Sequence, residues 1–112
     1  MSEEAPLGTF EEQVMLAVLR TKGDAYGMVI RREIEDVTGR EIAVGAVYAT
    51  LDRLEAKRLV ASSRGNVDSI SRKIFRVMPA GAKVLAESKA MRERLWRGVD
   101  LKTLLSPSSA AS

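Results

Sequence analysis

The side chains of this sequence that could do chemistry gather around the segment GAVYATLDRLEAKRLV, which covers residues 45–60. On a helical wheel at about 100° per residue, its large aliphatic residues fall on one narrow stripe. The opposite face carries little except Gly45, Ala49 and Ala56, with Asp52 nearby. A helix surface that faces water usually carries charge, so small residues there indicate that something bulky approaches the backbone.

A row of Ala46, Thr50, Arg53 and Lys57 runs between the stripe and the small face. Arg53 and Lys57 could bind phosphates or a guanine edge, and the Ala46 methyl could touch a thymine methyl. On the remaining side, Tyr48 could give its hydroxyl to a phosphate oxygen or pack its ring against the domain. The pattern predicts a recognition helix for the major groove of DNA. The alternative is that the glycine merely begins the helix and the alanines are good helix formers.

The composition excludes most catalytic chemistry. Cys and His are both absent from the 112 residues, which removes disulfides, thiolate nucleophiles, Cys/His zinc sites and imidazole acid-base catalysis. The sequence also contains no Gly-rich phosphate loop, no G-x-S-x-G and no S-x-x-K motif. We therefore expect no enzyme, no catalytic residue, no metal and no cofactor.

The net charge of +3 is unevenly distributed along the chain. Residues 1–12 carry −4, 13–39 carry 0, 40–76 carry +4 and 77–112 carry +3. This placement suits a polyanionic partner, although helices also carry Lys and Arg on ordinary solvated faces. No apolar run of about 18 residues is present, and the start MSEEAPLGTF is acidic where a secretory signal is basic. We therefore expect a cytoplasmic protein without a membrane partner.

Three helices are predicted in the first half of the chain. The first begins at a capping box formed by Thr9 and Glu12 and stops at Gly23. The second covers residues 28–38, with a glycine as its left-handed C-cap, and the third covers about 44–58. Short helices joined by tight Gly-bearing turns outline a helix-turn-helix.

A β-hairpin is predicted after the third helix. Residues 59–63 form a strand candidate, 64–69 are rich in turn residues, and 71–77 alternate with Phe75 and Val77 facing inward. A basic hairpin in this position would flank the same DNA as a wing. Its side chains would then meet the adjacent backbone or minor groove through Arg64, Arg72, Lys73 and Arg76.

A long helix is predicted to start at Pro79, where the missing N–H of proline is tolerated, and to extend over 79–105. Residues spaced by three and four give it a seam of the kind used between helices. A domain this small cannot cover the whole seam, so we expect a dimer interface made of Val84, Ser88, Met91, Leu95, Trp96 and Val99. The predicted domains are an acidic flexible N-terminus (1–6), a DNA-binding domain (7–78), this dimerisation helix and a disordered tail (106–112).

Four segments in this order resemble the PadR family of transcriptional regulators, named for the phenolic acid decarboxylase regulator. They are LGTFEEQVMLAVL, AYGMVIRREIEDVTG, GAVYATLDRLEAKRLV and SRKIFRVMPAGAKVL, and the resemblance covers roughly residues 7–96. Tyr26 and Gly27 match the family's Y-G-Y motif, with Met28 in place of the second aromatic. The family's G-x-x-Y-x-x-L-x-x-L recognition helix is matched by Gly45, Tyr48, Leu51 and Leu54.

The resemblance implies a mainly α fold with a small β-hairpin, namely a winged helix-turn-helix plus a long C-terminal dimerisation helix. It also implies a homodimer that commonly represses nearby genes, with Tyr48 and the basic residues near positions 72 and 73 on DNA. Three residues depart from the family pattern. Arg58 replaces a Gly after the third helix, Phe75 replaces a Tyr in the wing, and Met78 replaces the Thr that caps the last helix.

The sequence therefore predicts a sequence-specific DNA-binding regulator, a repressor acting as a homodimer on double-stranded DNA with an inverted-repeat operator. The alternative from another class is a winged-helix module that binds a protein through the small-residue face without specific DNA binding. Some family members bind flat hydrophobic effectors through aromatics of the last helix, and Trp96 is the candidate here. The sequence gives this effector no further support, and the favoured interpretation is that Trp96 anchors the dimer.

Overall fold

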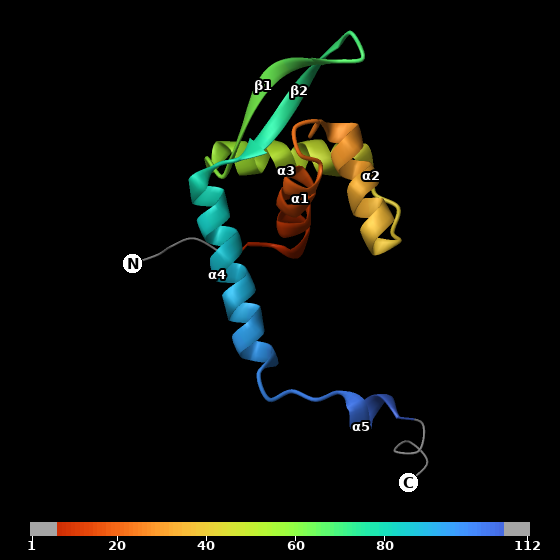
Figure 1. Cartoon of the computed structure of the whole chain (residues 1–112), viewed down its shortest axis with the longest axis vertical. Coiled ribbons are helices and arrows are strands. Elements are labelled where there is room, and N and C mark those ends of the chain that lie inside the picture. Colours follow the sequence, from red (N-terminus) through yellow and green to blue (C-terminus); the bar gives the residue numbers. More distant parts are fainter. Residues whose placement is uncertain (1–6, 107–112) are drawn as a thin grey trace.

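The computed structural model describes residues 7–106, which form five helices and one antiparallel hairpin. The helices are α1 (Thr9–Arg20), α2 (Gly27–Thr38), α3 (Val44–Ala56), α4 (Pro79–Trp96) and α5 (Lys102–Leu105), and the strands are β1 (Val60–Val67) and β2 (Ile70–Val77). In Figure 1, α1, α2 and α3 pack together, the hairpin projects from this body, and α4 carries α5 away from it. This mainly helical fold with one hairpin confirms the predicted fold class.

Helix α1 begins at Thr9 as predicted, but the predicted capping box is wrong. The N-cap is Gly8, and the Glu11 carboxylate accepts a hydrogen bond from the Gly8 amide at 3.0 Å. Glu12 is one residue farther along and does not cap its own helix. Its side chain turns toward α4, and its carboxylate pairs with Arg92 of that helix. The helix also ends at Arg20, before the turn that contains Gly23.

Helices α2 and α3 end in different ways. Gly39 closes α2 in the left-handed conformation with φ of 72°, as the sequence predicted. Helix α3 ends at Ala56, two residues earlier than expected, and Arg58 adopts a φ of 63°. Arg58 is therefore exposed and does not continue the buried stripe of α3.

The hairpin is longer and its turn is tighter than predicted. Strand β1 continues to Val67, and the strands are joined by Asp68 and Ser69, both with positive φ. Two central residues of this kind form a type I′ turn, whose twist matches the twist of the strands. The register places Arg64 opposite Lys73.

One hydrophobic core joins the three-helix body, the hairpin and the start of α4. Its largest fully buried side chains come from α1, α2, α3 and β1: Met15, Ile30, Leu51, Leu54, Val14, Val47 and Val60. Phe75 is 3% exposed, which confirms that it faces inward, and its amide donates to the Ala25 carbonyl at 2.8 Å. The hairpin is thereby fixed to the body at the end nearest α3.

Helix α4 starts at Pro79, and its buried residues lie in its first half, although Arg92 in the second half still pairs with Glu12 of α1. Gly81 and Leu85 are buried, and a β carbon built at Gly81 would collide with the Leu59 carbonyl oxygen. The expectation of one helix over 79–105 is wrong, because α4 ends at Trp96 and Gly98 takes a positive φ of 80°. The segments expected to be flexible or disordered are 1–6 and 106–112, and apart from Ser106 they lie outside the described residues.

Candidate nucleic-acid interface

The small-residue face of α3 points away from the body of the molecule. Val47, Leu51 and Leu54 are each 0% exposed, so the stripe predicted from the sequence is the buried face. The opposite residues are all exposed, and a β carbon at Gly45 would meet no atom within 4 Å. The exposed small residues are Gly45, Ala46, Ala49 and Ala56. The backbone of α3 is therefore accessible to a large partner along this face.

Thr50 does not lie on this face, and its prediction as a DNA-contacting residue is wrong for its side chain. It is 1% exposed, and its Oγ1 accepts a hydrogen bond from Arg53 Nη2 at 3.0 Å. Arg53 itself is exposed, and it lies near enough to α1 for its charge to help lower the pKa of Glu11. Thr50 therefore holds the Arg53 guanidinium at the edge of the small face.

Lys57 lies beyond the last turn of α3 and reaches back to α1. Its Nζ is 3.1 Å from Glu11 Oε2, which joins residues 46 positions apart in the chain. The hydrogen bond from the Gly8 amide, together with Lys57, holds the pKa of Glu11 below its ordinary value of 4.5, although burial acts in the opposite direction. This ion pair was not predicted, because its two members come from different helices.

Tyr48 lies on the other side of α3 and packs onto the start of α2. Its ring covers Gly27, which is buried, and a β carbon at Gly27 would collide with the ring. Tyr26 precedes Gly27 as the N-cap of α2 and makes no side-chain capping bond. The Arg72 guanidinium lies 4.7 Å from the centre of the Tyr26 ring, a cation–π distance. Sequence reasoning missed this contact of Tyr26, although the residue had been noted as part of a family motif.

The wing is held to α3 through Glu55. Glu55 Oε2 accepts a hydrogen bond from Ser62 Oγ of β1 at 2.7 Å, and Oε1 is 3.5 Å from Lys73 Nζ of β2. The Ser62 hydrogen bond and Lys73 hold the pKa of Glu55 below 4.5, against a smaller effect of burial. Arg64 is exposed farther along β1, and Arg76 is exposed on β2. The structure thus brings Lys73 to α3 and Arg72 to the start of α2, whereas Arg76 lines a hollow beside the end of α1 and is not brought together with them.

The predicted dimer residues of α4 differ in their surroundings. Val84 is half-buried, and Ser88 Oγ donates to Glu12 Oε1 of its own protomer at 3.4 Å. The residues farther along the helix and beyond it are exposed: Met91 by 40%, Leu95 by 70%, Trp96 by 58% and Val99 by 51%.

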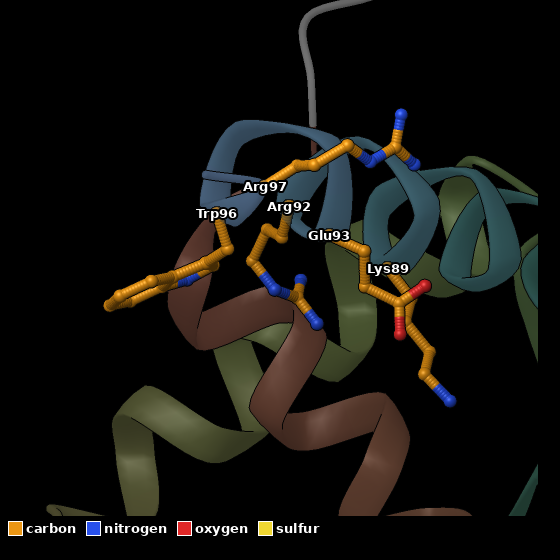
Figure 2. Close-up of a pocket in the computed structure, with 5 residues that line it drawn as sticks. All are labelled: Lys89, Arg92, Glu93, Trp96 and Arg97. Carbon is orange, nitrogen blue, oxygen red and sulfur yellow. The ribbon is translucent and has the colours of Figure 1, made fainter. Parts of the chain in front are cut away.

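A shallow hollow at the end of α4 is lined by Lys89, Arg92, Glu93, Trp96 and Arg97. In Figure 2 the Trp96 ring and Arg97 leave the end of the helix in different directions, while Arg92 turns toward α1. Trp96 is therefore accessible to a partner surface or a flat ligand.

Three packed helices followed by a hairpin that flanks the third define a winged helix-turn-helix protein. The sequence profile described as Transcriptional regulator PadR-like family matches residues 15–87. The chain belongs to this family, which consists of transcriptional regulators and not of enzymes.

Individual relatives agree with this assignment. Transcriptional regulator Rv3488 of Mycobacterium tuberculosis is 39% identical over 61 residues, which is 54% of this chain and 57% of that protein. A PadR family regulator from Eggerthella lenta superposes with a TM-score of 0.63 at 32% identity, over 84% of this chain and 81% of that one. A PadR-like regulator from Bacillus cereus superposes with a TM-score of 0.69 at 17% identity, over 79% of this chain and 84% of that one.

The match to curated relatives is partial in length. This chain spans 57% of the Mycobacterium tuberculosis protein, and 24% of an uncharacterized 37.1 kDa protein in a transposon of Streptomyces fradiae. Among residues 7–106, none of the helices has the length and apolar character needed to span a membrane.

Proposed function

We propose that the protein is a sequence-specific DNA-binding repressor that works in the cytoplasm as a homodimer. The observation that carries this proposal is the outward face of α3, where Gly45, Ala46, Ala49 and Ala56 are exposed with basic residues on both sides. A helix with such a face can approach the floor of the major groove more closely than one with long side chains. Within this proposal, residues 7–78 bind DNA and residues 79–105 supply the dimer surface.

The contacts in this complex follow from the position of each side chain. Arg53 and Lys57 leave α3 on the side of α1 and would meet one phosphate strand or a guanine edge. Tyr48 and Arg72 lie beside the start of α2, whose uncapped amides favour a phosphate oxygen. Lys73 and Arg64 extend this basic surface along the wing. Because few side chains on the outward face of α3 can bond to bases, groove shape would supply much of the specificity.

The exposed apolar residues of α4 support a dimer. A two-fold interface uses the same patch on both copies, so Met91, Leu95, Trp96 and Val99 would pack against their symmetry mates. Two recognition helices in successive major grooves lie about 34 Å apart. The operator would therefore be an inverted repeat with half-sites roughly one helical turn apart, and a dimer bound there would block access to a promoter.

The test is DNA binding by fluorescence anisotropy, with the upstream region of the protein's own gene compared against a random duplex of equal length. Wild type should prefer the upstream region, and footprinting should give a palindromic protected site. Replacing Arg72 and Lys73 with Ala should weaken binding to both duplexes and reduce the salt slope by up to about two phosphates' worth.

The matched control replaces Lys83 and Lys102 with Ala, because both lysines are exposed and belong neither to the surface of α3 and the wing nor to the patch of Met91, Leu95, Trp96 and Val99. The control should keep the wild-type salt slope. Equal and weak binding of wild type to both duplexes at physiological salt would instead favour the winged-helix module that binds a protein.

A further inference from the structure

Two lysines of the proposed DNA-binding surface are held by carboxylates of their own chain. Lys57 pairs with Glu11 on the α1 side of α3, and Lys73 pairs with Glu55 on the wing side. The two pairs therefore flank the small-residue face, one on each side. Any phosphate that binds either lysine must compete with a carboxylate that is already in place.

In each pair a second hydrogen bond holds the carboxylate in place, whereas the lysine side chain is free to move. Glu11 is fixed by the Gly8 amide at 3.0 Å and Glu55 by the Ser62 hydroxyl at 2.7 Å, in each case through the oxygen that does not face the lysine. The Glu11 side chain is 15% exposed, whereas the Lys57 side chain is 53% exposed. A lysine ammonium on its flexible four-carbon stem can leave, while the carboxylate stays where its second hydrogen bond holds it.

We propose that Glu11 and Glu55 restrain the DNA affinity of this surface by holding Lys57 and Lys73 until phosphates displace them. The inference rests on the proposed DNA-binding function. When DNA binds, each lysine exchanges one anion for another, and a fixed negative charge remains close to the phosphate backbone. Within this inference Lys57 and Lys73 bind phosphates and not a guanine edge. Phosphate contacts carry no sequence information, so this restraint acts on specific and non-specific duplexes alike.

The size of the effect follows from the strength of exposed ion pairs. Such pairs contribute little individually, which corresponds to about a 1.5- to 5-fold change in a binding constant for each. Salt screens the carboxylates as it screens the phosphates, so the restraint should fade as ionic strength rises. The two pairs lie on opposite sides of α3 and share no partner among the described residues, so their effects should combine approximately as a product.

The experiment uses the full chain with Glu11→Gln, Glu55→Gln and both together. Glutamine keeps an acceptor oxygen for the Gly8 amide or the Ser62 hydroxyl but removes the charge. Anisotropy titrations with the upstream duplex and a scrambled duplex should show each single variant binding both about 1.5- to 5-fold more tightly at low salt. The ratio between the two duplexes should stay at its wild-type value, and the gain should shrink at high salt.

The control is Glu87→Gln, which makes the same charge change at an exposed residue of α4 outside this surface. A second comparison introduces Glu11→Gln into a Lys57→Gln background, where most of the gain should disappear because the restrained lysine is gone. Thermal unfolding verifies that each variant is folded.

The inference would be overturned if Glu11→Gln and Glu55→Gln bound DNA with the same affinity as Glu87→Gln. The proposed function would remain intact in that case. Weaker binding would also overturn the inference, since the carboxylates would then be positioning the lysines for DNA. Failure of wild type itself to bind either duplex would refute the proposed function, and the inference with it.

Discussion

Arg58 stands in a backbone conformation that suits glycine. Its φ of 63° lies in the left-handed region, where the chain turns from the end of α3 into β1. The turn is fixed on both sides, because the Arg58 amide donates to Glu55 O at 2.9 Å and the Leu59 amide donates to Leu54 O at 2.9 Å. The structure therefore imposes this φ on whichever residue stands here, and a residue with a β carbon is strained by it.

Replacing Arg58 with Gly should stabilise the fold. We expect the free energy of unfolding to rise by about 0.5–1 kcal/mol, because relief of the left-handed strain exceeds the extra freedom of glycine in the unfolded chain. Urea denaturation followed by circular dichroism measures this change. Arg40→Gly is the control, since Arg40 is exposed and has no positive φ, and it should lower stability slightly. A lower midpoint for Arg58→Gly than for wild type would contradict the expectation.

The contact between α2 and α3 depends on a glycine. Gly27 is buried at the first position of α2 because the Tyr48 ring of α3 occupies the space that a side chain would take. The same ring lies in the candidate interface, and Gly27 beneath it directly follows Tyr26, whose ring is covered by the Arg72 guanidinium. The absence of a β carbon at Gly27 therefore determines how α2 and α3 pack. It also determines where Tyr48, a proposed DNA contact, lies.

Gly27→Ala and Gly45→Ala should have opposite effects on stability. The alanine at position 27 would push the Tyr48 ring aside, and overpacking of this kind costs about 1–3 kcal/mol. We also expect weaker DNA binding, because Tyr48 would move. At Gly45 an alanine meets no atom within 4 Å, so stability should stay level or rise by up to about 1 kcal/mol from helix propensity. Thermal unfolding of the two variants distinguishes them, and equal losses would show that the Tyr48 contact is not the cause.

The elements that the sequence predicts well are those with a local cause. Gly39 ends α2 because a left-handed residue follows the last turn, and the apolar spacing of α3 identifies its buried face. Local patterns fail where a distant contact decides. Thr50 lies beside the apolar stripe on the wheel, and its hydroxyl suggested solvent, yet the body buries it under Arg53.

Other errors also have physical reasons. Residues 64–69 were predicted as a turn because they are rich in turn-forming residue types. Only Asp68 and Ser69 form the turn, and residues 64–67 pair with β2. The seam expected in the last helix continues past Trp96 to Val99, but Gly98 between them has a positive φ that ends the helical path. The pairing of Glu11 with Lys57 joins two helices, so neither local segment contains the information that predicts it.

The molecule as a whole is elongated, with extents of 62, 38 and 21 Å, because α4 leaves the body. Gly81 and Leu85 pack the start of α4 against the body, and Glu12 of α1 pairs with Arg92 farther along the helix. Beyond this point the apolar side chains of α4 and the following segment face outward, with Leu95 and Trp96 more than half exposed. We propose that these side chains form an interaction site, because exposed patches of large apolar residues commonly bind a partner.

Replacing Leu95 with Asp should separate the proposed dimer. A charge buried in a two-fold interface meets its own copy or an apolar neighbour, and either costs binding energy, so we expect the dimer dissociation constant to rise at least about ten-fold. Sedimentation velocity over a concentration series measures this change, and the weakened dimer should also lose affinity for a two-site operator more than for a single half-site. Lys83→Asp places the same carboxylate at an exposed residue in the first half of α4 and should leave the dimer intact. A wild-type protein that sediments as a monomer would remove the dimer from the proposal, whereas an unchanged dimer in Leu95→Asp would move the interface to another face.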